Sequence, residues 1–234
     1  MSKRSELLRL FVAEQRDPEP FYRRLAADAV DRLPFSVAGA RVLDLGCGPG
    51  HYTRALRQAG ATVLPLDLDP KEFALPGGPP HGEVVGDGSR LPVGTGALDG
   101  VLCSNMLEHT PDPGAVIGEL ERVVHPGGWI WLSWTNWYSP WGGHDISPWH
   151  YLGPLCAERR YVRRYQRQPK HHCGVNLFPV HIGPVLRALR ARPDVTIVEA
   201  RPRYYPRWCR LLVRLPGLRE VVTWNLMLIL RHIE

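Results

Sequence analysis

Histidine and aspartate side chains gather in one unusual stretch of the sequence, WTNWYSPWGGHDISPWHY at residues 134–151. An imidazole beside a carboxylate can remove a proton from a hydroxyl group, because the carboxylate orients the ring and stabilises its charged form. A further histidine stands in CSNMLEHTPDP at residues 103–113. The candidate catalytic residues are therefore His109, His144, Asp145 and His150.

A second candidate site is the glycine-rich segment VLDLGCGPG at residues 42–50. Glycines after a strand let the backbone approach a ligand closely at the start of the next helix. The spacing is G-x-G-x-G, and His51 occupies the position where the dinucleotide fingerprint G-x-G-x-x-G has its third glycine. This departure argues against a nicotinamide or flavin dinucleotide as the ligand.

Strand-like and helix-like segments alternate around these motifs over residues 41–135. Such alternation with short connections predicts a parallel, doubly wound sheet, whose ligands bind beyond the carboxyl ends of the strands. Two later apolar segments, residues 195–205 and 220–230, are expected to pair antiparallel at the sheet edge. We therefore predict an α/β fold with a mostly parallel seven-stranded sheet and an antiparallel last strand.

The 234 residues are consistent with a single domain. Two short helices are expected in residues 5–33, interrupted at Asp17 and Pro18. The expected parts are an N-terminal helical cap (residues 1–38), a ligand-binding core (39–135), an insertion after the fifth strand (136–180), and a C-terminal helix with edge strands (181–234).

Four motifs in the core resemble those of class I S-adenosylmethionine (SAM) dependent methyltransferases, in the same order and at similar spacing. They are DLGCGPG at residues 44–50, the acidic Asp67 ending the second strand, GDGSRLP at 86–92, and CSNMLEHTPDP followed by HPGG at 125–128. The resemblance implies SAM as cofactor. The cofactor-binding residues that it implies are Tyr22, Asp44, Gly46, Cys47, Gly48, Gly50, Asp67, Leu68, Asp87, Gly88, Ser104 and Asn105.

The resemblance also implies a role for some of these residues. Asp67 would accept hydrogen bonds from both ribose hydroxyls, as a carboxylate can. Asp87 would contact the adenine amino group, while the backbone of Gly88 lies along the ring. Ser104 or Asn105 would touch the methionine moiety. Tyr22 would lie near the methionine carboxylate, or else only flank a core-facing stripe of its helix.

A narrower resemblance covers nearly the whole chain. Similarity to uncharacterised actinobacterial methyltransferases, loosely associated with saccharide or cell-envelope pathways, is seen in EQRDPEPFYRRLAAD, GGHDISPWHYLG and the C-terminal PRYYPRW and LREVVTWNL. The expected reaction is O-methylation of a small molecule, with a sugar or glycoconjugate favoured. The alternatives are O- or N-methylation of an aromatic natural product or a lipid-linked precursor, and a non-catalytic SAM-binding module.

The tryptophans fall into two groups. Trp129, Trp131 and Trp134 are expected on the fifth strand, where sheet packing accounts for them. Trp137, Trp141 and Trp149 stand in a segment interrupted by glycine and proline, and they are candidates for binding the acceptor. Their alternative is a small satellite core under the loop.

Charge and composition exclude several classes of function. The net charge is +6, but the basic residues form no evident stripe, so no nucleic-acid partner is expected. The densest basic run, residues 158–172, is expected on an exposed helix face. RWCRLLVRLPGLRE at 207–220 is amphipathic and could make weak peripheral contact with a membrane. No apolar run reaches the ~20 residues of a transmembrane helix.

The cysteines and the remaining histidines suggest neither disulfides nor metal. Five cysteines at irregular spacing indicate a reducing, cytoplasmic compartment. His171, His172 and Cys173 follow one another, with Cys156 and His181 nearby, but the spacing fits no standard zinc pattern and indicates an exposed loop instead. No metal site is therefore expected, and the chain is expected to be a monomer or a homodimer.

Overall fold

A single seven-stranded sheet organises the protein, with strand order β3-β2-β1-β4-β5-β7-β6. The structure, a computed structural model, describes residues 9–10, 17–74 and 81–233. Two helices are expected in residues 5–33, and the first of them lies outside the described residues, except for residues 9–10. The strands are β1 (Arg41–Leu45), β2 (Thr62–Asp67), β3 (Val84–Val85), β4 (Leu98–Ser104), β5 (Val124–Thr135), β6 (Val195–Pro202) and β7 (Asn225–His232).

The pairing confirms the predicted topology. β1 pairs in parallel with β2 and β4, and β4 pairs in parallel with β5. β7 runs antiparallel to both of its neighbours, β5 and β6. The last strand therefore lies inside the sheet, and β6 forms the edge. Because β6 is antiparallel to β7, it runs parallel to β5 and ends at the same edge of the sheet.

Helices cover both faces of this sheet. The α-helices are α2 (Pro18–Asp31), α3 (His51–Gln58), α4 (Pro113–Val123), α5 (Pro154–Tyr165), α6 (Ile182–Arg190) and α7 (Leu218–Val222). The short 3₁₀ segments are η1 (Glu72–Ala74), η2 (Leu107–His109), η3 (His144–Ile146), η4 (Trp149–Leu152) and η5 (Arg207–Arg214). The core against α2 and α3 is separate from the core against α4 and α6.

β5 shows how the sequence pattern builds these two cores. Trp129 and Trp131 pack on the face covered by α2 and α3, whereas Trp134 is fully buried on the opposite face. Side chains alternate between faces along a strand, so a strand buried on both faces carries apolar residues at most of its positions. All three tryptophans are thus packing residues, as the sequence predicts.

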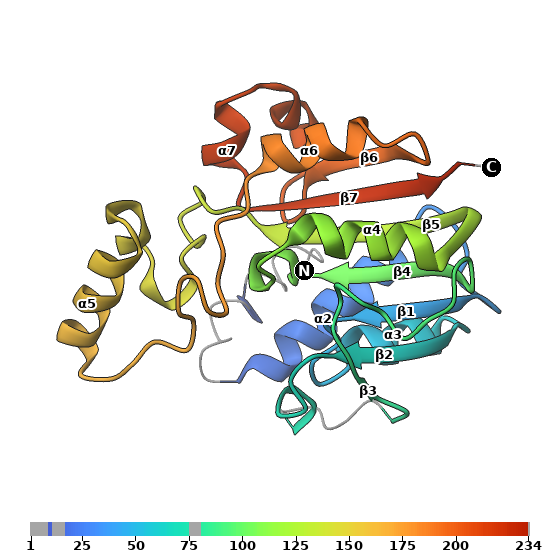
Figure 1. Cartoon of the computed structure of the whole chain (residues 1–234), viewed down its shortest axis with the longest axis horizontal. Helices are drawn as coiled ribbons and strands as arrows, with labels where there is room; N and C mark the ends of the chain where they lie inside the picture. The colour runs from blue at the N-terminus through green and yellow to red at the C-terminus, as the bar shows by residue number, and fades with distance from the viewer. Residues whose placement is uncertain (1–8, 11–16, 75–80, 234) are drawn as a thin grey trace.

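The insertion (residues 136–180) departs from the strand–helix alternation and carries η3, η4 and α5. In Figure 1, β7 runs to the right and α5 stands at the left, beyond the edge where the parallel strands end. On α5, Arg159, Arg160, Arg163 and Arg164 are exposed, while Ala157 and Tyr161 are buried. The expected exposed basic helix face is confirmed. Among the described residues, no helix is long and apolar enough to cross a membrane.

Candidate functional site

The glycine turn between β1 and α3 has the backbone conformation that its sequence requires. Gly46, Gly48 and Gly50 have φ of +72°, +49° and +77°, a region that residues with a Cβ rarely adopt. Asp44 is buried, and its carboxylate accepts a 2.6 Å hydrogen bond from the hydroxyl of Thr53 in α3. Burial raises the pKa of Asp44 to about 7. Asp44 therefore braces the helix against the end of β1.

Asp67 joins the end of β2 to this turn. Its Oδ2 accepts a hydrogen bond of 2.9 Å from the backbone N–H of Gly48, and its Oδ1 accepts one of 3.2 Å from Asp69. Burial raises the pKa of Asp67, and it also raises the pKa of the Cys47 thiol in the turn, which stays neutral. The next residue, Leu68, is exposed. A carboxylate thus stands at the predicted ribose position.

Three strand ends approach one another closely at Met106. A Cβ on Gly88 would lie 2.5 Å from Met106 Cε, and one on Gly46 would lie 3.1 Å from Met106 Cγ. Gly88 therefore packs directly against the flexible end of the Met106 side chain. Asp87 is exposed, and its Oδ1 accepts hydrogen bonds of 2.8 Å from both the N–H and the hydroxyl of Ser89.

Tyr22 lies beside the start of α3. Its ring stacks on that of His51, with centroids 6.1 Å apart and an interplanar angle of 18°. Its side chain is 40% exposed, while Leu25 and Ala26 of the same helix are buried. α2 therefore presents Tyr22 next to the glycine turn rather than into the core.

Ser104 and Asn105, at the end of β4, are joined to a residue that the sequence analysis did not single out. Nη1 of Arg203 donates hydrogen bonds of 3.0 Å to Ser104 Oγ, to Asn105 Oδ1 and to Ser133 Oγ. Nη2 of Arg203 donates to the hydroxyl of Tyr52. One side chain thus ties together the ends of β4, β5 and β6 and the first turn of α3.

Arg203 is a buried cation. It is only 9% exposed, and its guanidinium lies 4.8 Å from the centre of the Trp131 ring. In the described part of the chain, no carboxylate forms an ion pair with it. The signal for Arg203 was available, because it follows directly on a strand that ends at the ligand-binding edge of the sheet. A buried charge without an anionic partner is costly unless something compensates it.

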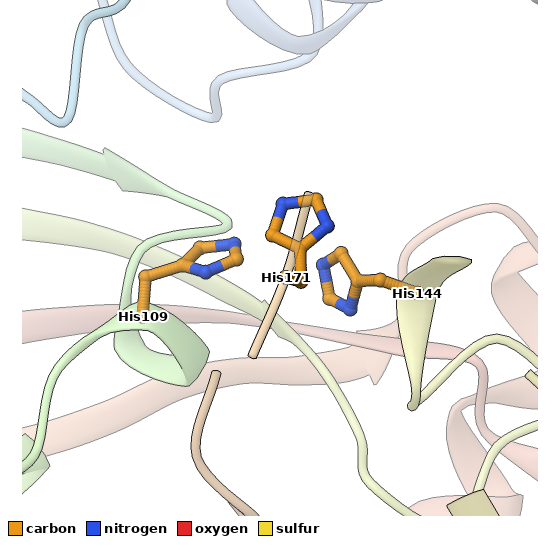
Figure 2. Close-up of side chains that lie close together, drawn as sticks. All are labelled: His109, His144 and His171. Carbon is orange, nitrogen blue, oxygen red and sulfur yellow. The ribbon is translucent and has the colours of Figure 1, made fainter. Parts of the chain in front are cut away.

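Three histidines from different segments meet beyond the ends of β4 and β5. They are His109 of η2, His144 of η3 and His171, which follows α5; we call them the histidine cluster. Their ring centroids are 5.1 Å apart for His109 and His144, 5.3 Å for His109 and His171, and 4.7 Å for His144 and His171. Figure 2 shows the three imidazole rings turned toward one another. The sequence predicts an exposed loop at His171, but its side chain is only 17% exposed.

Asp145 contacts His171 and fixes the position of its side chain. Its Oδ1 lies 3.2 Å from His171 Nδ1, and its Oδ2 accepts hydrogen bonds from the backbone N–H groups of Lys170 and His171. Burial alone would raise the pKa of Asp145, but these contacts outweigh it and lower the pKa to about 2. Burial, with the neighbouring His109 and His171, lowers the pKa of His144 to about 3. His144 is therefore neutral at physiological pH.

The remaining candidates in the insertion have mixed surroundings. His150 is buried, and its ring lies edge-on to that of Trp137, with the ring centroids 5.2 Å apart. Trp137 is itself buried, and Trp149 packs against a small core of Ile146, Ala157 and Tyr161. The satellite core considered as the alternative is thus present. Trp141 differs, because its ring is 46% exposed and stacks on Trp224 at 4.1 Å.

Comparison with known sequences agrees with this arrangement. A family model described as "Methyltransferase domain" matches residues 43–132. An "Uncharacterized methyltransferase" of Mycobacteroides abscessus is 37% identical over 246 residues, covering 99% of this chain and 94% of that protein. Another of the same description, from Mycolicibacterium gilvum, is 39% identical over 243 residues with the same coverage.

Solved structures share the fold. A SAM-dependent methyltransferase from Mesorhizobium loti superposes with a TM-score of 0.60 at 24% identity, covering 90% of this chain and 98% of that one. One from Archaeoglobus fulgidus gives 0.57 at 17% identity, covering 94% and 98%. Because relatives above 30% identity span almost its whole length, the chain belongs to the class I SAM-dependent methyltransferases, enzymes whose cofactor is S-adenosyl-L-methionine.

Proposed function

We propose that this enzyme transfers the methyl group of SAM to a hydroxyl group of a small molecule, and that the favoured acceptor is a sugar or glycoconjugate. The observation that carries the proposal is the histidine cluster beyond the ends of β4 and β5. A hydroxyl group must lose its proton to become a good nucleophile, and imidazole is the side chain best suited to remove it near neutral pH. An acceptor that is already ionised would not need such a group.

The cofactor would be held by residues from several strand ends. Asp67 would accept hydrogen bonds from the ribose hydroxyls, and the backbone of Gly88 would lie along the adenine ring. The guanidinium of Arg203 would provide the positive charge for the methionine carboxylate, next to Ser104 and Asn105. This assignment is supported by the burial of Arg203 and by the lack of a carboxylate partner among the described residues. An arginine–carboxylate pair would add an anionic partner to the hydrogen bonds and the aromatic ring that already surround this buried charge.

The proton of the acceptor would pass to the histidine cluster. The carbonyl oxygen of Asn176 lies 2.7 Å from Nδ1 of His109 and can only accept a hydrogen bond. Nδ1 therefore carries the hydrogen, and Nε2 keeps a lone pair that can take the acceptor's proton. When bound, SAM supplies a sulfonium methyl group, so the new O–C bond forms as the C–S bond breaks and S-adenosylhomocysteine leaves.

The insertion would provide the acceptor site. Trp141 and Tyr138 are each 46% exposed, and the backbone N–H of His144 donates a 2.9 Å hydrogen bond to the carbonyl of Trp141. Exposed aromatic rings beside polar groups suit the apolar face of a sugar ring. Lys170 Nζ also lies 3.4 Å from Glu72, which follows β2. This ion pair brings the insertion across to the cofactor side of the site.

The test is methyl transfer from SAM with an isotope-labelled methyl group to a panel of acceptors, followed by mass spectrometry of the product. The panel should contain hydroxyl-bearing saccharides, catechols and amines. We expect labelled methyl ethers of a saccharide, and we expect His109→Ala to lower turnover about 100-fold or more with unchanged affinity for S-adenosylhomocysteine. Methylation of only the aromatic or amine acceptors, or full activity of the variant, would show that the proposal is wrong.

A lipid-linked acceptor is the second candidate, favoured by the surface of η5 and α7. Trp208 is 72% exposed, and Leu211, Leu215, Leu218 and Val221 are also exposed. Arg207, Arg210 and Arg214 are exposed in the same segment. Exposed apolar side chains together with arginines match the boundary between anionic headgroups and acyl chains. Such contact would bring the enzyme to an acceptor that is carried on a lipid.

A further inference from the structure

The histidine cluster has the composition and spacing of a metal-binding site. One nitrogen from each of the three rings lies within 4.8 Å of the corresponding nitrogen of the other two. The rings come from η2, η3 and the segment after α5, which are far apart in the sequence. The segment after α5 also contacts η2, because the N–H of Phe178 donates a 2.8 Å hydrogen bond to the carbonyl of Glu108.

Each histidine also has an oxygen atom against its Nδ1. The partners are the Asn176 carbonyl for His109 at 2.7 Å, the Asp145 carboxylate for His171 at 3.2 Å, and the Gly142 carbonyl for His144 at 3.4 Å. These oxygens accept hydrogen bonds, so each Nδ1 carries the hydrogen and each Nε2 keeps its lone pair. Metal-bound histidines in proteins almost always have this arrangement, with a carboxylate or carbonyl fixing the other ring nitrogen.

We propose that Nε2 of His109, His144 and His171 bind one divalent transition-metal cation, with Zn²⁺ as the best match. Imidazole nitrogen suits zinc and its neighbours, whereas magnesium and calcium prefer oxygen ligands. Three protein ligands leave a coordination position open, which is typical of catalytic rather than structural zinc sites. The sequence spacing suggested no metal because the three ligands come from three separate segments.

The cluster needs only a small rearrangement to hold the ion. Nitrogens bound to zinc at about 2.1 Å in a tetrahedron lie roughly 3.4 Å apart. The three nitrogens now lie within 4.8 Å of one another. Side-chain rotation that moves each nitrogen by about an ångström would bring them to the spacing of zinc ligands. The backbone of His144 has φ of +51°, which is unfavourable for a residue with a Cβ. The loop holds this conformation through the Trp141 and Ser147 hydrogen bonds, and His144 thereby faces the other two rings.

The open coordination position could bind the hydroxyl group of the acceptor, and this role rests on the proposed function. An acceptor hydroxyl bound there becomes more acidic, because the cation stabilises the oxygen anion. The proton leaves to water, the oxygen attacks the methyl carbon, and the electrons of the C–S bond remain on sulfur. The cation is neither oxidised nor reduced, so no further reactant is needed. In this form of the reaction the histidines act as ligands rather than as the final base.

The test is calorimetric titration of Zn²⁺ into the full chain, purified without a histidine tag and treated with a chelator. We expect one site per chain. His109→Gln, His144→Gln and His171→Gln should each weaken zinc binding about 100-fold or more. Asp145→Asn should weaken it 10- to 100-fold, because it loosens the partner of His171. The matched controls are His172→Gln, which removes a neighbouring histidine paired with Glu158 instead, and Cys156→Ser, which removes an exposed thiol.

Cobalt provides a second measurement that needs no variant. Bound Co²⁺ should give visible absorption bands of a low-coordinate, nitrogen-ligated ion, and Zn²⁺ should displace it. Failure of the wild-type chain to bind either ion at one equivalent, or equal affinity in the three histidine variants, would overturn the proposal. That result would leave the proposed function standing, because hydroxyl methylation by a metal-free histidine base is measured separately with the acceptor panel.

Discussion

The carboxylate of Asp67 accepts a hydrogen bond of 2.9 Å from the backbone N–H of Gly48. This contact joins the end of β2 to the glycine turn after β1, so the acidic side chain predicted to bind the ribose also holds the turn. Burial raises the pKa of Asp67, yet two backbone N–H groups favour its charged form. A carboxylate is thus kept available where a vicinal diol would bind.

Asp67→Ala should weaken binding of S-adenosylhomocysteine by at least tenfold, measured by calorimetry. Each hydrogen bond to a charged group contributes about 1.5–3 kcal/mol, and the ribose would lose its acceptor. Asp69→Ala is the matched control, because Asp69 is exposed and its side chain accepts only from the N–H of Lys71 among the described contacts. Equal loss in both variants would point to the loop conformation instead of the ribose contact.

Arg203→Met should weaken S-adenosylhomocysteine more than 5′-methylthioadenosine, which lacks the amino-acid carboxylate. The guanidinium is proposed to bind that carboxylate, and loss of a buried charged partner typically costs several kcal/mol. Calorimetry with both ligands on both proteins separates this role from general damage. If Arg203 only supports the fold where the strands end, the two ligands should lose affinity by the same factor.

The stability of the free protein should depend on Asp44 between about pH 4 and pH 7. Its pKa is raised from 3.8 to about 7, so the folded protein keeps the proton that the unfolded chain has lost. The free energy of unfolding therefore falls as pH rises through this window, by about 1.4 kcal/mol per pH unit from this group. Asp44→Asn, whose side chain does not titrate, should remove roughly 2 kcal/mol of the difference between pH 5 and pH 7.

Urea unfolding at the two pH values measures this directly. Asp99 does not interfere, because hydrogen bonds from Arg41 lower its pKa to about 2, below the window. An unchanged pH dependence in Asp44→Asn would mean that Asp44 is ionised in the folded protein.

The surface of η5 and α7 should bind anionic membranes. We expect the protein to float with phosphatidylglycerol vesicles at low salt and not with phosphatidylcholine vesicles. Trp208→Ser should reduce the bound fraction several-fold, since an exposed tryptophan supplies interfacial area. Val175→Ser is the control, because Val175 is 75% exposed but belongs to the insertion. No flotation with either lipid would remove the membrane contact.

Local sequence features predict most of the fold. The run from Val42 to Leu45 reads as a buried strand, the glycines after it require a turn, and the alternation of such units implies a parallel sheet. Each of these features depends only on residues that are close together in the sequence, so the sequence is enough to predict it. The position of Asp67 beside the turn follows as well, because parallel strands bring their carboxyl ends to one edge.

The histidine cluster could not be found in this way. The insertion folds back over the ends of β4 and β5, and this brings together His109, His144 and His171. No local sequence pattern predicts the path of such a segment. In the sequence, His171 stands beside His172 and Cys173, and these neighbours predict an exposed loop. In the folded chain the carboxylate of Asp145 holds His171 toward the other two rings.

The contacts of Arg203 likewise could not be predicted from local sequence patterns. The sheet, the glycine turn, the acidic residue at the end of β2 and the family can all be predicted from the amino-acid sequence, because they depend on short-range patterns and on strand order. Which polar side chains face one another depends on the tertiary structure. Arg203 lies about a hundred residues from Ser104 in sequence and 3.0 Å from it in space. Contacts between distant segments are set by the packing of the whole chain, and that packing determines the chemistry that the site can perform.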